Sequence, residues 1–190
     1  MLKRAAKSVC RTLAAATMFI PASVSGFGQL AGPFLFFGQL VALMPGVIGD
    51  YIRVAYYAMT LRECSSQSRI SFGTFFAQSS TVVGRGVYIG AYCVIGSCEI
   101  GDRTQIASQV QILSGRHQHA RNADGQIMGA ADEEFTPIVI GADCWIGASA
   151  ILMADVGPGT TIGAGSVVTR PVSENVVAVG NPVRVLELAK

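Results

Sequence analysis

Charged side chains are scarce in this sequence, and one long stretch has none. Asp, Glu, Lys and Arg make up 14% of its 190 residues, and the formal net charge is +2. No charged residue occurs from Thr12 to Gly49, and the first acidic residue is Asp50. The small net charge argues against a nucleic-acid partner. The long uncharged stretch is typical of chain that is removed from water.

The uncharged stretch lacks an unbroken apolar run that could cross a membrane as one straight helix. Pro21, Pro33 and Pro45 divide it into pieces of about eleven residues, whereas a spanning helix needs about 20. Basic residues flank it on both sides, so the positive-inside rule keeps both ends cytoplasmic. We therefore predict that residues 1–69 form an apolar helical segment that lies in, or re-enters, the inner membrane leaflet. The alternatives are a signal peptide and a helical cap that meets no lipid.

Histidine and metal-ligand patterns are also sparse. The two histidines, His117 and His119, are two residues apart, which is one ligand short of a three-histidine zinc site, so we expect no bound metal. The cysteines show neither metal-ligand spacing nor a disulfide framework. We interpret them as small buried thiols of a reducing compartment. They are Cys10, Cys64, Cys93, Cys98 and Cys144.

A six-residue repeat is the strongest pattern that is present. Its apolar or aromatic positions are Ile70, Phe76, Val82, Tyr88, Val94, Ile100, Ile106 and Ile112. A period of six fits neither a helix nor one long strand, but it fits short strands joined by tight corners. Three such strands close a triangular coil of about 18 residues, and stacked coils bury their inward side chains in columns. The repeat predicts a mainly β fold with a parallel β-helix over residues 70–185, followed by a short tail at 186–190.

The repeat is interrupted once. Residues 113–137 are polar and partly acidic, and the six-residue pattern resumes at Ile140. A loop excursion of this length from a regular stack usually reaches a substrate or a neighbour. Leu152 and Ile162 are ten residues apart rather than twelve, so we also predict a tighter corner between them.

Four motifs within residues 70–185 carry a resemblance. They are Ser-Gly-Arg-His at 114–117, Asp-Cys-Trp-Ile-Gly at 143–147, Ile-Gly-Ala-Gly-Ser-Val-Val at 162–168 and Gly-Asn-Pro-Val-Arg-Val at 180–185. In order and spacing they resemble the hexapeptide-repeat acyltransferases, and in particular the sugar O-acetyltransferase branch. The resemblance implies a left-handed parallel β-helix, acetyl-CoA as cosubstrate, and a homotrimer whose active sites lie between subunits.

The excursion carries the expected catalytic group. A sugar hydroxyl needs a base of pKa near 7 to take its proton as it attacks a thioester. The resemblance implies that this base is His117, and His119 is the alternative. The carboxylates of Asp132, Glu133 and Glu134 are candidates to orient the base, although a solvated acidic loop would have the same composition.

The expected cofactor contacts lie after the excursion. The resemblance implies that Trp145 lies beside the pantetheine arm of CoA, and that small residues at the corners let this arm approach the backbone. The small residues are Gly147, Ala148, Ala164, Gly165 and Ser166. Arg170 and Arg184 are candidates to bind the CoA phosphates. The acceptor-binding asparagine of the family has no clear counterpart around residues 89–94.

With its apolar N-terminal segment, the whole chain resembles membrane-associated acetyltransferases of exopolysaccharide gene clusters. We therefore predict an O-acetyltransferase that acts on a sugar hydroxyl of a surface or exopolysaccharide precursor, lipid-linked or free, at the cytoplasmic side of the inner membrane. The alternatives are a soluble acetyltransferase for serine, a free sugar or a drug, and a non-catalytic β-helix scaffold.

Overall fold

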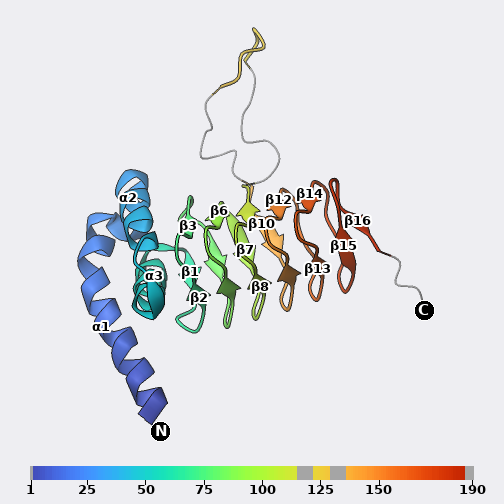
Figure 1. The fold of residues 1–190 in the computed structure, drawn as a ribbon. Coiled ribbons are helices and arrows are strands. Elements are labelled where there is room, and N and C mark those ends of the chain that lie inside the picture. Colours follow the sequence, from blue (N-terminus) through green and yellow to red (C-terminus); the bar gives the residue numbers. More distant parts are fainter. Residues whose placement is uncertain (1, 115–121, 129–135, 187–190) are drawn as a thin grey trace.

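Three helices and a stack of short strands make up the described chain (Figure 1). The computed structural model describes residues 2–114, 122–128 and 136–186, with side chains from residue 7 onward. His117, His119, Asp132, Glu133 and Glu134 lie outside the described residues. The helical elements are α1 (Leu2–Val24), the 3₁₀ helix η1 (Gly26–Gly28), α2 (Ala31–Ala42) and α3 (Gly46–Thr60).

The strands form three sheets that run along the stack. Sheet A contains β1 (Glu63–Cys64), β4 (Val82–Val83), β7 (Cys98–Ile100) and β10 (Ile138–Ile140). Sheet B contains β2 (Arg69–Ile70), β5 (Tyr88–Ile89), β8 (Gln105–Ile106), β11 (Trp145–Ile146), β13 (Thr161–Ile162), β15 (Val177–Val179) and β16 (Arg184–Val185). Sheet C contains β3 (Phe75–Phe76), β6 (Val94–Ile95), β9 (Gln111–Ile112), β12 (Ile151–Leu152) and β14 (Val167–Val168).

The chain visits sheets A, B and C in turn, and this order makes it a parallel β-helix. Successive coils pair in parallel, and β16 is the antiparallel exception, lying beside β15. The predicted mainly β fold and parallel coil are therefore confirmed, and the left hand of the coil stays a prediction. Strand pairing begins at β1, seven residues before Ile70.

Most two-residue strands turn one side chain into the coil, where it stacks on its counterparts in neighbouring coils. The inward column of sheet B is fully buried and consists of Ile70, Ile89, Ile106, Ile146, Ile162 and Ala178. Such columns supply most of the apolar burial of the repeat, because a short strand has no other face to hide.

The strict six-residue step is wrong in the middle of the repeat. The inward residues are Val83, Ile89 and Ile95 rather than Val82, Tyr88 and Val94. The step from Phe76 to Val83 is seven residues and the step from Ile95 to Ile100 is five. Because the side chains of a strand alternate in direction, a slip of one residue exchanges the buried and the exposed side chain.

The predicted tight corner after Leu152 is confirmed, and a second one follows it. Val156 comes four residues after Leu152 and bridges Ile140 and Val172 in parallel, which continues sheet A. Val172 likewise comes four residues after Val168. The last coils are therefore shorter than the first ones, and their inward columns stay aligned.

The helices pack on the first coil, and Arg53 of α3 joins the two parts. Its guanidinium is fully buried. It donates hydrogen bonds to the carbonyl oxygens of Met44 (2.6 Å) and Ile70 (2.8 Å), and Nη2 contacts Asp50 Oδ1 at 2.7 Å. Burial lowers the pKa of Arg53, and Asp50 opposes that shift. A buried charge is tolerated only when it is paired and hydrogen-bonded in this way.

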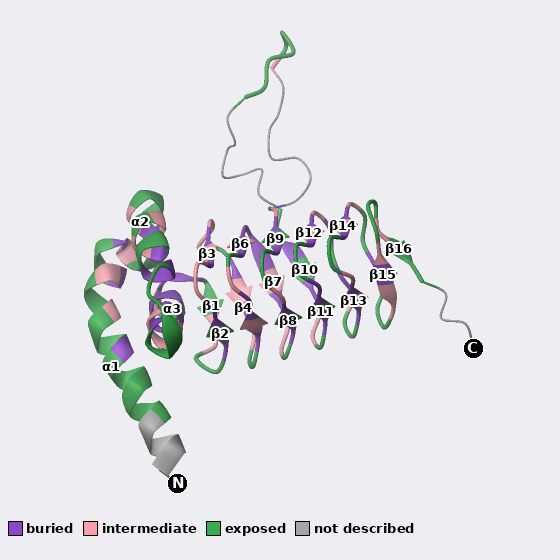
Figure 2. Cartoon of the chain, in the orientation of Figure 1, coloured by how far each residue is buried: buried purple, intermediate pink, exposed green. Residues whose placement is uncertain are grey.

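The outer surface of the helices is largely exposed (Figure 2), and it carries many large apolar side chains. The exposed large side chains are Val9, Leu13, Phe19, Ile20, Val24, Phe27, Leu30, Phe36, Leu40, Leu43, Met44, Val47 and Ile48. Within the described chain, no helix combines the length and the apolar character that crossing a membrane requires.

The cysteines follow the predicted pattern in part. Cys93, Cys98 and Cys144 are buried free thiols, and burial raises the pKa of Cys98 to about 12. The interpretation is wrong for Cys10, which is exposed on α1.

Candidate active site

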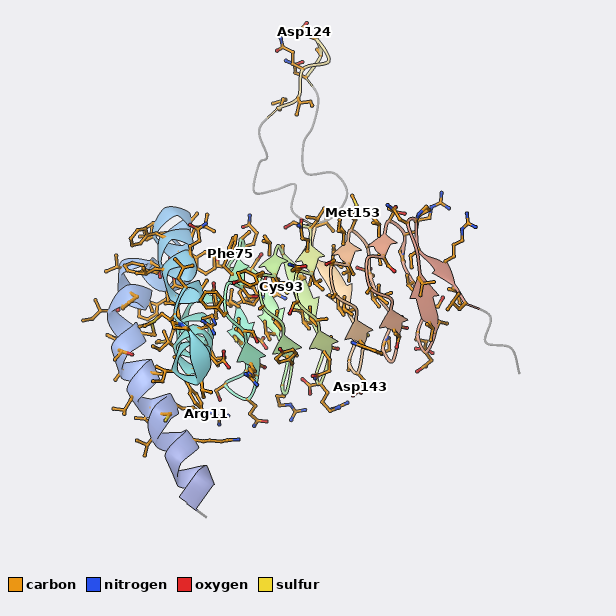
Figure 3. All side chains as sticks on the ribbon, in the orientation of Figure 1. Arg11, Phe75, Cys93, Asp124, Asp143 and Met153 are labelled. Atoms are coloured by element: carbon orange, nitrogen blue, oxygen red, sulfur yellow. The ribbon has the colours of Figure 1, made fainter. Side chains whose placement is uncertain are left out.

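The chain turns between sheets at three corners, and each corner recurs on successive coils. The B–C corner contains the residues expected to line the pantetheine arm, the C–A corner contains the excursion, and the A–B corner contains Asp102 and Asp143. In Figure 3, Met153 on the C–A corner and Asp143 on the A–B corner lie on opposite sides of the β-helix. The three corners therefore present separate surfaces along the molecule.

Trp145 marks the sheet B side of the B–C corner. It lies on the outer face of β11, between Gln105 and Thr161 of the neighbouring strands, and 61% of its surface is exposed. Its strand partner Ile146 points inward and is fully buried. A large aromatic ring that is open to solvent beside a backbone corner can cover an apolar part of a ligand.

Ala148, Ala164 and Gly165 form the corner itself on two successive coils. The N–H of Gly165 donates to Ala148 O at 2.8 Å, which fixes the spacing of the coils. Ala148 and Ala164 are exposed, and within the described residues their N–H groups have no hydrogen-bond partner. Gly165 has φ +68°, and a Cβ added there would meet nothing within 4 Å. The corner thus offers free backbone N–H donors on an open surface. A ligand with amide carbonyl groups can accept hydrogen bonds from such donors.

Gly147 and Ser166 face a different environment. A Cβ on Gly147 would lie 2.4 Å from Ala164 N, so glycine is required here for coil stacking. Ser166 is fully buried, and its Oγ accepts a hydrogen bond from Gly180 N at 3.0 Å. The Ser166 hydroxyl therefore stabilises the core side of the corner, and Ala148, Ala164 and Gly165 form its outer side.

Of the two arginines, Arg170 lies away from this corner in one chain, whereas Arg184 pairs with Val179, whose side chain is next to Gly163 of the corner. Arg170 is exposed at the C–A corner after β14, and Arg184 is exposed on β16. Neither forms an ion pair with the described residues. Arg170 shares its edge of the molecule with the excursion, whereas Trp145 and Ala148 lie across sheet C from that edge.

The excursion leaves and rejoins the β-helix at the C–A corner. Ser114 is buried at its start, and its Oγ accepts a hydrogen bond from Ser97 N at 2.7 Å. Pro137 precedes β10 at its end. Asp124, in the described turn at residues 122–128, stands clear of the β-helix in Figure 3. The root of the excursion is thus anchored in the core, and His117 follows Ser114 by three residues of sequence.

A cavity that the sequence gave no reason to expect lies at this root. It has a volume of about 320 Å³ and is bounded by η1, the start of α2 and the C–A corners of the first coils. Its polar lining consists of Gln29, Gln78, Ser79, Ser80 and Ser97. Their hydroxyl and amide groups can both donate and accept hydrogen bonds. These residues come from segments far apart in the chain, so no local motif joins them.

The A–B corner holds ion pairs. Arg85 contacts Asp102 Oδ2 at 2.7 Å through Nη2, and Arg103 Nε contacts Asp143 Oδ1 at 2.7 Å. Hydrogen bonds from the Arg85 backbone and side chain lower the pKa of Asp102, and those from Arg103 lower the pKa of Asp143. These carboxylates tie neighbouring coils together, so they are poor candidates for proton transfer near neutral pH.

The family resemblance rests on the match of the repeat itself. Residues 80–114 and 137–170 match the model described as bacterial transferase hexapeptide (six repeats). Over these residues the β-helix resembles the hexapeptide-repeat transferases. The unmatched residues between the two segments coincide with the excursion, so the family repeat and the observed coils agree in their boundaries.

Relatives that the chain resembles include two proteins of Escherichia coli (strain K12). The galactoside O-acetyltransferase is 32% identical over 120 residues, which cover 59% of this chain and 56% of the relative. WcaF, which is named for an acetyltransferase role in colanic acid biosynthesis, is 33% identical over 98 residues, and 48% of each chain is covered. This chain thus spans about half the length of these relatives.

A solved structure supports the fold over most of this chain. The maltose O-acetyltransferase from Clostridium difficile 630 superimposes with a TM-score of 0.66 at 23% identity. The match covers 85% of this chain and 89% of that chain, so it includes helical residues as well as the β-helix. The arrangement of helices ahead of a hexapeptide coil is therefore shared between the two folds.

Proposed function

We propose that this protein transfers the acetyl group of acetyl-CoA to a hydroxyl of a carbohydrate, a precursor of a surface polysaccharide or exopolysaccharide. The observation that carries the proposal is the B–C corner, where the N–H groups of Ala148 and Ala164 are free and the exposed Trp145 lies two residues ahead of the corner on β11. An extended pantetheine arm has amide carbonyl groups that accept from such donors and an apolar portion that an indole covers.

The chemistry proposed for His117 follows from this donor. As general base, it takes the proton of the acceptor hydroxyl while the hydroxyl oxygen attacks the thioester carbonyl. The tetrahedral oxyanion then collapses, the C–S bond breaks, and the CoA thiolate leaves and receives the proton. A backbone N–H at a coil corner can stabilise the oxyanion. His119 is the alternative base.

The positions of the corners support a site shared between subunits. Within one chain, the excursion leaves from the C–A edge of sheet C, whereas Ala148 lies at its B–C edge and Trp145 lies on β11 of sheet B. A homotrimer would place the excursion of one subunit against the B–C corner of its neighbour. Arg170, on the same edge as the excursion, would then face the cofactor of the neighbouring subunit, where it can bind a CoA phosphate.

The cavity at the root of the excursion is the proposed site of the carbohydrate acceptor. Carbohydrates present hydroxyl groups that both donate and accept hydrogen bonds, and the side chains of Gln29, Gln78 and Ser80 match this requirement. The cavity adjoins Pro137, where the excursion ends. A carbohydrate bound in this cavity would lie at the C–A corner, where the excursion that contains His117 leaves the β-helix.

We further propose that the reaction takes place at the cytoplasmic face of the inner membrane. Two observations support this location. The helical end exposes many large apolar side chains, and no acidic residue precedes Asp50. A relative is named for a role in colanic acid biosynthesis. Surface helices of this composition bind in the plane of a lipid interface.

The test is transfer of labelled acetyl from acetyl-CoA into membranes, followed by separation of lipid-extractable glycan from soluble products. Label in the glycan fraction supports the proposal, and label only in soluble sugars or amines contradicts the proposed acceptor. The Trp145→Ala variant tests the proposed cofactor corner in the same assay. It should raise the KM for acetyl-CoA about tenfold, the effect of losing about 1.4 kcal/mol of binding, while its circular dichroism stays unchanged. An unchanged KM would contradict the cofactor corner.

A further inference from the structure

Two pockets lie between α1 and α3 and share Tyr51, and we call them together the groove. One part of the groove is cationic and the other part is apolar. At one end, Lys7 and Arg11 of α1 face Arg69 of β2, with Ser66 and Ser68 from the first A–B corner completing the lining. Figure 3 labels Arg11 where α1 passes α3. A second, apolar pocket between α1 and α3 shares Tyr51 with this cationic end. Charged and apolar linings therefore meet at Tyr51 on the helical end.

The charge at this end is not balanced. Asp50 is the one carboxylate in the lining, and it is engaged by Arg53 and Arg69 at 2.7 Å each. Lys7 and Arg11 form no ion pair with the described residues. Both cations therefore remain available to an anion, and Arg69 is held beside them by Asp50. Lysine and arginine on adjacent elements are well suited to bind phosphate oxygens.

The rest of the groove is suited to a hydrocarbon chain. It is lined by Leu13, Ala14 and Thr17 of α1 and by Ile48 and Ile52 of α3. From Lys7 to Thr17, α1 advances about 15 Å at 1.5 Å per residue. The rim is apolar as well, because 62% of Leu13 and 73% of Ile48 are exposed. The free energy falls when lipid replaces water around exposed apolar side chains of this kind.

We infer that this groove binds one anionic phospholipid of the bilayer. Its phosphate contacts Lys7, Arg11 and Arg69, and an acyl chain lies along α1 and α3. The site orients the β-helix on the membrane, with α1 in the plane of the interface. The site lies among the helices, away from Trp145 and the B–C corner. The inference rests on the proposed function only where it gives the site a role in acetyl transfer at the membrane.

The experiment measures binding of the full chain to vesicles by flotation. One set of vesicles contains phosphatidylcholine alone and the other contains phosphatidylcholine mixed with phosphatidylglycerol. The charge variant is Lys7→Gln with Arg11→Gln, and its matched control is Arg85→Gln with Arg103→Gln, which removes the same charge from the exposed β-helix surface. The apolar variant is Leu13→Ser with Ile48→Ser, and its control is Val139→Ser on the exposed face of β10.

We expect tight binding to the anionic vesicles and weak binding to phosphatidylcholine alone. The charge variant should bind anionic vesicles about 30-fold more weakly, given about fivefold for each basic residue near an anionic surface. The apolar variant should also lose binding, and both controls should bind like wild type. Equal binding of the charge variant and its control would overturn the headgroup site, and so would equal binding to both kinds of vesicle.

Inorganic phosphate distinguishes a lipid from a free anion. If the protein binds phosphate at constant ionic strength but no vesicle, the pocket holds a soluble ligand and the inference is wrong. Acetyl transfer is measured on the same preparations. Vesicle binding without transfer would overturn the proposed function and leave the lipid site standing. Transfer to glycan without vesicle binding would do the reverse.

Discussion

The β-helix and the helical end handle apolar residues in opposite ways. In the β-helix, most two-residue strands bury one side chain in an inward column and leave its neighbour partly or fully exposed. In the helices, thirteen of the twenty large apolar side chains that are exposed in the described chain lie between Val9 and Ile48. The β-helix thus buries much of its apolar surface internally, whereas the helical end leaves large apolar side chains exposed. Under the proposed function, the β-helix carries the chemistry and the helical end carries the location.

Removing the proposed base separates these roles most strongly. We expect His117→Ala to lower kcat for acetyl transfer by about 10²- to 10⁴-fold, the usual contribution of a general base, and to leave vesicle binding unchanged. His119→Ala is the matched variant, and its kcat should change far less. A larger loss in His119→Ala would exchange the two assignments, and full activity of both variants would contradict base catalysis by the excursion.

Replacing the link between the regions tests whether they fold as a unit. Arg53→Leu should lower the free energy of unfolding by about 3–5 kcal/mol, because it leaves Asp50 and several carbonyl groups without their buried partner. Arg62→Leu is the control, since Arg62 and Glu99 are both nearly half exposed, and it should cost at most about 1 kcal/mol. Urea denaturation of both variants measures the difference. Similar losses would show that burial of Arg53 adds no stability.

The observed register of the coil predicts opposite results for two adjacent residues of β6. Ile95→Ala should cost about 2–5 kcal/mol of unfolding free energy because it leaves a cavity in the inward column. Val94→Ala, on the partly exposed side, should cost under about 1 kcal/mol. The strict six-residue step predicts the reverse order, so chemical denaturation of the pair decides between the two registers.

The smallest effect concerns pH. Arg103 depresses the pKa of Asp143 in the folded chain, so the pair adds stability above the unfolded-state pKa of about 3.9. That contribution should be lost as the pH falls through the lower folded-state pKa. The melting temperature of Arg103→Gln should therefore differ slightly from wild type at pH 6 and converge with it as the carboxylate is protonated. A constant difference across this range would contradict the linkage.

Much of the coil follows from its sequence, and its departures from regularity do not. The apolar step from Ile100 to Ile112 predicts the inward column there because each strand has one apolar side chain. Between Phe76 and Ile100 the strands carry adjacent apolar pairs, such as Val82–Val83 and Val94–Ile95. Composition cannot show which member points inward, so the seven- and five-residue steps became evident only from strand pairing.

Arg53 and the candidate site show the same limit in other ways. A charged residue in an amphipathic helix indicates a solvated face. Arg53 is nevertheless buried, and it donates hydrogen bonds to the carbonyl oxygens of Met44 and Ile70. Sequence motifs identified the corner of Ala148 and Ala164, because small residues recur there. They could not show that Ser166 faces the core or that Arg170 lies on another edge, since both depend on where each corner falls around the coil.

The antiparallel pairing of β16 with β15 bears on self-association. A stack of parallel coils ends in unpaired backbone groups at each end, and such edges invite another chain to add a strand and grow a fibre. Here α2 and α3 cover the first coil, and β16 lies beside β15 in the reverse direction. In sheet B, a second copy that met β16 would find a reversed strand rather than a parallel edge to continue. This strand therefore protects the end of sheet B against end-to-end growth.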